Sequence, residues 1–103
     1  MKRTVQVKEH AAEQLTDAFL WYEKQKENLG VEFLDEWESV TAYLSEYAEG
    51  CAKKYKEFRQ AMLKRFPYVV VYEIENDSVI IYNIINVKRN PSKRYKKKTK
   101  KSS

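Results

Sequence analysis

The 103-residue sequence is poor in the residues that most often carry metal and nucleophilic chemistry. It has one cysteine, Cys51, and one histidine, His10. A single cysteine excludes an internal disulfide, and the two residues together offer neither a zinc cluster nor a nucleophile–His–acid triad. The only glycines, Gly30 and Gly50, cannot form a glycine-rich phosphate loop. We therefore expect no bound metal and no cofactor.

Long apolar runs are also missing. The first ten residues, MKRTVQVKEH, lack the apolar stretch of a signal peptide, and no run approaches the roughly 18 apolar residues of a membrane span. A chain of this length forms at most one domain with one modest core. The sequence thus predicts a single cytoplasmic domain that does not enter a membrane.

Acidic residues are absent from the end of the chain. Residues 88–103 contain nine of the 20 Lys and Arg residues and no acid, whereas residues 1–87 contain the other 11 with all 15 acids, a net charge of −4. A strongly basic end favours binding to nucleic acid or to an acidic protein. We expect residues 1–95 to form the domain and residues 96–103 to form a basic, disordered tail.

Apolar periodicity predicts one short strand followed by two helices. Residues 3–7 (RTVQV) alternate as a strand does. Apolar side chains then recur at spacings of three and four over residues 8–29, and again over residues 31–48. Residues 28–30 (NLG) supply a stop for the first helix, with the glycine suited to a left-handed conformation. Because this connection is so short, the two helices should form an antiparallel hairpin.

After Gly50 the apolar period changes from 3.6 to 2, which predicts strands at residues 56–65, 68–75 and 78–87. The last two strands are rich in Val, Ile and Tyr, and residues 76–77 (ND) suit a tight hairpin turn. The predicted order is β-α-α-β-β-β. We therefore expect an α+β fold, with the helical hairpin packed on one face of an antiparallel sheet.

The predicted hairpin of the last two strands is apolar on both faces. With a two-residue turn, Val70 should pair with Asn83 on the face that carries the helices. The opposite face would then carry Val69, Val71, Ile80, Tyr82 and Ile84. A sheet covered on one side only normally alternates apolar and polar residues, so a second apolar face indicates a partner-binding surface. Alternatively, the tail or a second copy of the chain in a homodimer covers this face, or the register differs.

The remaining candidate site is basic and aromatic. Its members are Lys64, Arg65, Lys88, Arg89, Lys93, Arg94 and Tyr95. Such a set could act on RNA without a metal, because Lys and Arg stabilise the charge of a phosphoryl transition state while a tyrosine stacks a base or transfers a proton. Composition alone favours the simpler interpretation, in which the cations give only sequence-independent affinity for nucleic acid or an acidic target.

Three stretches occur in an order that resembles a known family. They are WYEKQKENLGVEFLDEW (21–37), RFPYVVVYEIENDSVIIYNI (65–84) and KRNP (88–91). Together they resemble the RelE/ParE superfamily of bacterial type II toxin–antitoxin toxins, which includes plasmid stabilisation factors, over residues 3–95. The resemblance implies a helical hairpin on an antiparallel sheet. It also implies a toxin that inhibits growth until a cognate antitoxin wraps and neutralises it in a hetero-oligomer.

This superfamily divides by mode of action. RelE-like members cleave mRNA on the ribosome with basic residues on the sheet and a C-terminal arginine and tyrosine, whereas ParE-like members lack that set and poison DNA gyrase. Arg89 and Tyr95 match the C-terminal pair, but Val69, Met62 and Gln60 stand where the resemblance places basic residues. Losing one such cation costs about 10²–10³ in rate. The resemblance therefore favours a ParE-like, non-enzymatic toxin. A ribosome-dependent mRNA endonuclease and a non-toxic nucleic-acid-binding module are the alternatives.

Overall fold

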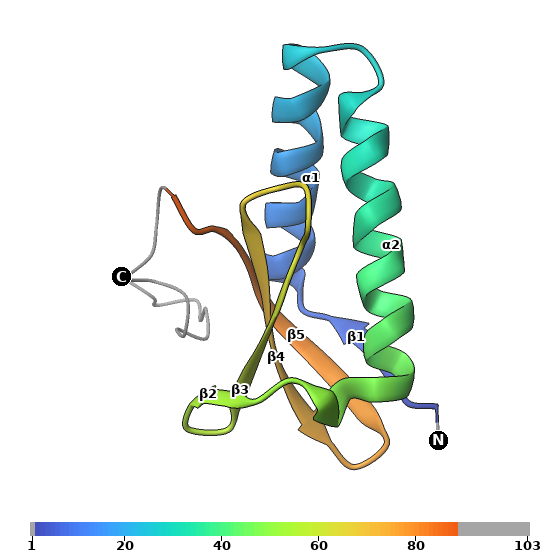
Figure 1. The fold of residues 1–103 in the computed structure, drawn as a ribbon, viewed down its shortest axis with the longest axis vertical. Helices are drawn as coiled ribbons and strands as arrows, with labels where there is room; N and C mark the ends of the chain where they lie inside the picture. The colour runs from blue at the N-terminus through green and yellow to red at the C-terminus, as the bar shows by residue number, and fades with distance from the viewer. Residues whose placement is uncertain (1, 89–103) are drawn as a thin grey trace.

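The computed structural model describes residues 2–88. Two helices pack on one face of a five-stranded sheet, which confirms the expected α+β class (Figure 1). The elements are β1 (Thr4–Val7), α1 (Glu9–Gln25), α2 (Leu29–Tyr47), the short 3₁₀ helix η1 (Ala48–Gly50), β2 (Lys53–Tyr55), β3 (Phe58–Met62), β4 (Tyr68–Glu75) and β5 (Ser78–Asn86). The expected tail at residues 96–103 lies outside the described residues.

The sheet has the strand order β1-β5-β4-β3-β2 and is mixed rather than wholly antiparallel. β1 runs parallel to β5, with Thr4 opposite Ser78, while the other three neighbouring pairs are antiparallel. Parallel neighbours require a long crossover connection. Here that connection consists of both helices and three strands, so the direction of β1 depends on contacts that are remote in sequence.

The strand predicted over residues 56–65 is shorter in the structure, where β3 covers only Phe58–Met62. A short strand, β2, precedes it, and Lys56 takes a positive φ of 52° in the turn before β3. β3 ends at Met62, after which the amide of Leu63 donates a hydrogen bond to the carbonyl of Tyr68 at 3.0 Å. All three residues of β2 are exposed. Because β2 has no apolar face, nothing in its pattern marks it as a strand.

The helical hairpin and the sheet share one hydrophobic core. Its buried members from the helices include Ala11, Ala18, Tyr22, Phe33, Trp37 and Leu44, and those from the sheet include Val70, Tyr72, Val79 and Ile81. Within this core, four aromatic rings from both helices, β4 and the β3–β4 connection pack with centroid separations of 4.8 to 6.1 Å; they belong to Tyr22, Phe33, Phe66 and Tyr68. The aromatic cluster fixes the helical hairpin over the β3–β4 connection, beside the candidate site.

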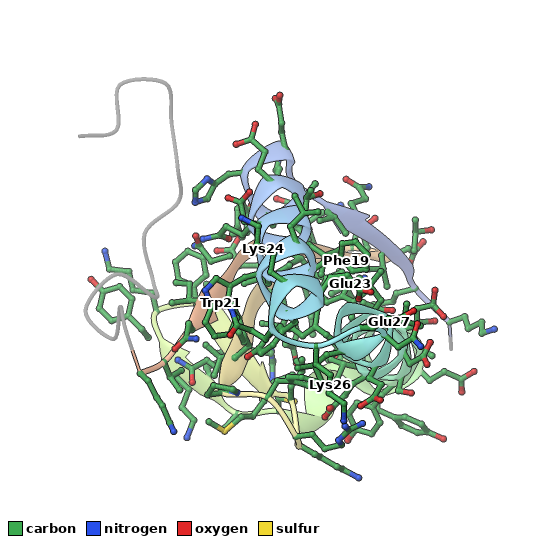
Figure 2. All side chains as sticks on the ribbon, turned by 90° about the horizontal axis from the view of Figure 1, so that it is seen from above. Phe19, Trp21, Glu23, Lys24, Lys26 and Glu27 are labelled. Carbon is green, nitrogen blue, oxygen red and sulfur yellow. The ribbon has the colours of Figure 1, made fainter. Side chains whose placement is uncertain are left out.

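The connection between the helices is held by a single carboxylate (Figure 2). The two oxygens of Glu23 accept hydrogen bonds from the amides of Asn28 and Gly30, both at 2.9 Å. Asn28, at φ 71°, is the left-handed residue here, and Gly30 lies inside the first turn of α2. The predicted role of Gly30 as a left-handed helix stop was therefore wrong. Its function is close packing, since a Cβ at Gly30 would lie 2.7 Å from the carbonyl oxygen of Phe19.

The β4–β5 hairpin has the predicted turn, with Asn76 at φ 55°, but its register shifts at a β-bulge. Beyond the bulge Val70 pairs with Ile84, so the predicted pairing of Val70 with Asn83 was wrong. Tyr82 is the extra residue of the bulge, because Ile81 lies opposite Tyr72 and Asn83 lies opposite Val71, which are adjacent in β4. A bulge reverses the face of every residue that follows it relative to an uninterrupted strand.

Two polar side chains tie the sheet to the helical layer. The side-chain oxygen of Gln14 in α1 accepts a hydrogen bond from the amide of Ile84, just beyond the bulge, at 2.7 Å. The buried hydroxyl of Tyr72 donates to the carbonyl of Ala48 in η1 at 2.6 Å. Burial, reinforced by the nearby Cys51 thiol, raises the pKa of the Tyr72 hydroxyl, so this group remains a neutral donor.

Candidate target-binding site

Three of the predicted basic residues lie at the same end of the sheet. The amide of Val87, just after β5, donates to the carbonyl of Pro67 at 2.9 Å. This bond brings Lys88 beside the β3–β4 connection, which carries Lys64 and Arg65. All three cations are exposed. We refer to Lys64, Arg65 and Lys88 as the basic end of the sheet.

Two carboxylates of α2 position this basic end. Glu36 accepts hydrogen bonds from the backbone amides of both Lys64 and Arg65, and the guanidinium of Arg65 lies 2.5 Å from the carboxylate of Glu32. The hydrogen bond that the guanidinium of Arg65 donates to Glu32 raises the pKa of Arg65 above its ordinary value. Glu32, in the first turn of α2, thus helps to hold the β3–β4 connection and also interacts favourably with the helix dipole.

The rest of the predicted basic and aromatic set lies outside the described residues. This applies to Arg89, Lys93, Arg94 and Tyr95. Their roles in catalysis or target binding stay predictions. Lys88 is the last described residue, and its amide donates to the side-chain oxygen of Asn86 at 2.9 Å. The chain therefore leaves β5 directly at the basic end of the sheet.

The structure brings together the three positions where the resemblance places basic residues. Met62 and Gln60 of β3 lie opposite Val69 and Val71 of β4. Directly opposed residues in an antiparallel pair share a face, and alternate residues of one strand do so as well. Gln60, Met62 and Val69 therefore occupy one face of the sheet, and none of them carries a charge.

Arg59 is the basic residue within β3, and it belongs to the opposite face. One nitrogen of its guanidinium donates to the carbonyls of Cys51, at 2.6 Å, and Glu49, at 3.3 Å. These bonds fasten the segment between η1 and β2 to the sheet. Arg59 is thus committed to a structural role on the helical side and does not replace the missing cations.

The face of the sheet that points away from the helices holds a second, smaller hydrophobic cluster. Val69, Val71 and Ile80, all predicted to bind a partner, are only 1%, 0% and 4% exposed. Val69 and Val71 pack with Phe58 and Ile85 in this cluster, and Tyr82 packs against it, half-buried. These valines are therefore packed inside the described domain, and partner binding by this set stays a prediction.

Ile84 does not belong with the other members of the predicted partner-binding set. It is 2% exposed and packs in the core beneath the helices, whereas Ile85 lies in the cluster on the far face. The bulge at Tyr82 is the reason, because it moves the residues after it to the face opposite the predicted one. Placing Ile84 on the far face was therefore wrong.

A groove that sequence reasoning missed lies between α2 and β3. Its volume is about 660 Å³, and the residues that line it are Glu36, Ser39, Val40, Tyr43, Cys51, Gln60, Ala61, Met62, Lys64 and Arg65. Tyr43 remains 49% exposed. The available signal was Tyr43 beside the apolar seam of α2, but the opposing wall comes from β3, which is distant in sequence. The groove ends at Lys64 and Arg65 of the basic end.

A second, smaller hollow lies between α1 and the end of β5. Its volume is about 330 Å³, and its lining includes Trp21, Asp17, Tyr68 and Asn86. Trp21 is 46% exposed and projects from the side of α1 away from α2 (Figure 2). It packs edge-to-face on Tyr22, with the ring centroids 5.1 Å apart.

Residues 2–88 contain neither a membrane-spanning helix nor a cluster of metal-binding side chains. Neither α1 nor α2 is long and apolar enough to cross a membrane. Within the same residues, no group of three or more His, Cys, Asp or Glu side chains is placed to hold a metal ion.

Comparison with known proteins places this geometry in a family. The family model described as "ParE toxin of type II toxin-antitoxin system, parDE" matches residues 5–91. A solved structure described as "Chromosomal ParDE TA system from P. aeruginosa" superposes with a TM-score of 0.73 at 15% identity, covering 82% of this chain and 96% of that chain. At this identity the likeness shows a shared fold. No curated protein sequence matches.

Proposed function

This chain belongs to the family of ParE toxins of type II toxin–antitoxin systems, and from that premise we propose that it acts by binding its target rather than by cleaving RNA. DNA gyrase, the target that the resemblance implies for ParE-like members, is the candidate. The observation that carries the proposal is the uncharged set Gln60, Met62 and Val69 on one face of the sheet.

Metal-independent RNA cleavage needs preorganised cations where negative charge develops, and removing one such group typically costs about 10²–10³ in rate. The three sheet positions, which hold Gln60, Met62 and Val69, supply no cation. Arg59 donates to backbone carbonyls on the other face, and the guanidinium of Arg65 pairs with Glu32. The three sheet positions therefore lack the cations of a nuclease, and Arg59 and Arg65 are engaged elsewhere, which supports binding as the mode of action.

The proposal also includes a cognate antitoxin as partner and action in the cytoplasm, where such a target is found. The basic end of the sheet supports an acidic partner or a nucleic-acid-bearing target, because exposed Lys and Arg side chains steer such molecules by long-range attraction. The cations of residues 88–103 add to this field. Antitoxin binding would place the toxin in a hetero-oligomer until the antitoxin is lost.

The test is induced expression of the toxin with separate measurements of DNA, RNA and protein synthesis. We expect DNA synthesis to stop first, and we expect the purified protein to inhibit supercoiling by gyrase. An Arg89→Ala, Tyr95→Phe double variant is the matched control for the nuclease alternative and should remain toxic. Early arrest of translation, abolished by the double substitution, would instead establish an mRNA endonuclease. Unimpaired growth would favour a non-toxic binding module.

A further inference from the structure

The short hairpin formed by β2 and β3 carries a group of cations that the sequence analysis did not single out. Residues 53–56 (KKYK) include three lysines, and every residue from 52 to 57 is exposed. The turn between the two strands projects from the edge of the sheet, clear of both helices (Figure 1). None of these side chains belongs to the core, so packing does not account for them. We refer to residues 53–56 as the hairpin patch.

The acidic residues nearest in sequence leave this patch with a net positive charge. The carboxylate of Glu57 pairs with the ammonium of Lys53 at 3.0 Å, and that of Glu49 lies 3.3 Å from the guanidinium of Arg3. Between Glu49 and Glu57 the chain contains no acid. Lys54 makes no ion pair with any residue among 2–88. An incoming anion therefore meets a cation that no carboxylate of the described domain neutralises.

Lys56 takes an unfavourable backbone conformation at the tip of the hairpin. Its φ of 52° lies in the left-handed region, which glycine adopts freely and asparagine several-fold more often than most residues. The ammonium of Lys56 lies 5.3 Å from the centroid of the Tyr55 ring, an arrangement that orients the cation while its charge remains. Residues held in such sparsely populated conformations cluster at functional sites. A lysine at this position therefore indicates a role for its charge.

The hairpin patch and the cations of the β3–β4 connection lie at opposite ends of β3 (Figure 1). β3 has five residues, which span about 17 Å at the usual rise per residue. In duplex DNA, two phosphate backbones flank a major groove about 12 Å wide. Cations at the two ends of one short strand are therefore spaced to reach both backbones across a single groove.

We propose that the hairpin patch binds the phosphate backbone of duplex DNA, with Lys54 and Lys56 as the residues that contact phosphate. The contact is independent of base sequence, because lysine–phosphate pairs position a protein on the duplex without reading bases. This inference rests on the proposed function for its setting, since DNA gyrase works on duplex DNA. It adds a second contact, in which the toxin holds the DNA as well as the enzyme.

A double variant of the full 103-residue chain tests the site. Lys54→Gln with Lys56→Asn removes both cations, and the thermal midpoint should not fall, because asparagine suits the left-handed position. Binding to a short fluorescein-labelled DNA duplex of mixed sequence is measured by fluorescence anisotropy over a range of salt concentrations. Affinity at low salt should fall at least about 5-fold. The slope of log K against log salt should become shallower by about 1.8, since each phosphate contact contributes about 0.9.

The matched control is the double variant Lys24→Gln, Lys26→Gln. It removes the same charge from two exposed lysines at the end of α1 (Figure 2), where the helical hairpin lies farthest from the β2–β3 turn. Its salt slope should stay within about 0.3 of wild type, because neither lysine contacts phosphate. Equal changes of slope in the two double variants would show that only the overall charge matters and would overturn the proposal.

Two further measurements separate this site from the proposed function and from RNA binding. If the hairpin variant loses DNA binding but the wild type does not inhibit supercoiling by gyrase, the DNA contact stands and the proposed target is wrong. If the wild type inhibits gyrase and the hairpin variant binds DNA as tightly as the wild type, the target stands and the hairpin site is refuted. Weaker binding to duplex RNA, with DNA binding unchanged, would make the patch an RNA site and would also refute the proposal.

Discussion

Gly30 shows how a single residue fixes the relation between the helices. It lies in the first turn of α2, directly against the backbone of α1, and its amide is held by Glu23. A Cβ there would lie 2.7 Å from the carbonyl oxygen of Phe19, which is backbone and cannot rotate away. The other glycine, Gly50, has only the Tyr43 hydroxyl within 4 Å, at 3.2 Å from such a Cβ.

We therefore expect Gly30→Ala to destabilise the protein. Alanine gains about 1 kcal/mol of intrinsic helix propensity over glycine, but forcing apart two packed backbones costs about 1–3 kcal/mol, and we expect the clash to outweigh the gain. Urea denaturation followed by circular dichroism measures the free energy of unfolding. The matched control, Gly50→Ala, should change it by less than about 0.5 kcal/mol. Equal effects of the two substitutions would contradict the role of close packing at Gly30.

At the scale of one element, the bulge in β5 decides which residues face the helices. It places Ile84 in the core and Ile85 on the far face. The bulge also leaves the amide of Ile84 to be satisfied from outside the β4–β5 ladder, and the side chain of Gln14 in α1 accepts it. A helix and a strand that are 70 residues apart in sequence are thus joined where the strand changes face.

The substitution Gln14→Leu should show how much the hydrogen bond between Gln14 and the amide of Ile84 contributes to the free energy of unfolding. The substitution leaves the partly buried amide of Ile84 without its acceptor, and an unsatisfied group of this kind costs about 1–3 kcal/mol. Gln14→Glu keeps an oxygen acceptor at the same position and should lose less. Both variants can be compared by urea denaturation, with the exchange rate of the Ile84 amide as a local measurement. If Leu and Glu at position 14 were equivalent in both measurements, the bond would not support the bulge.

At the scale of the whole molecule, charge is divided along the chain. The acids lie within residues 1–87, and the densest run of cations lies within residues 88–103. The structure places Lys64 and Arg65 in the β3–β4 connection, which is hydrogen-bonded to Val87 just after the end of β5. Lys64 and Arg65 from one part of the sequence and Lys88 from another therefore lie at the same end of the sheet.

Deleting residues 96–103 should weaken binding to duplex DNA or an acidic partner without reducing stability. The deletion removes five lysines and no apolar residue, so the thermal midpoint should not fall. The dependence of log K on log salt should become shallower by up to about 4.5, since each of the five lysines can make one phosphate contact and each contact contributes about 0.9. Replacing the same five lysines by glutamine should reproduce the change. An unaltered salt dependence in both proteins would refute the electrostatic role of this segment.

The candidate site was only partly predictable from the chain. Lys64, Arg65 and Lys88 were recognised as cations by composition and order, and the structure does bring these three together. The groove between α2 and β3 was not foreseen, because its two walls are contributed by segments that are joined only by folding. The hydrogen bonds that Arg59 donates to the carbonyls of Cys51 and Glu49 were not foreseen either, because bonds of this kind leave no periodic signal in the sequence.

The sequence by itself determined the helical hairpin and the β4–β5 hairpin, because apolar periodicity and turn residues act over short distances along the chain. The resemblance to the family rested instead on three stretches of sequence and their order. Only the tertiary structure decided the parallel direction of β1, the strand β2, the bulge that moves Ile84 into the core, and the packing role of Gly30. Each of these four features depends on which segment, distant in the sequence, packs beside it in the folded protein. Pairing, close approach and shared cavities are set when distant segments meet, and no local pattern records them.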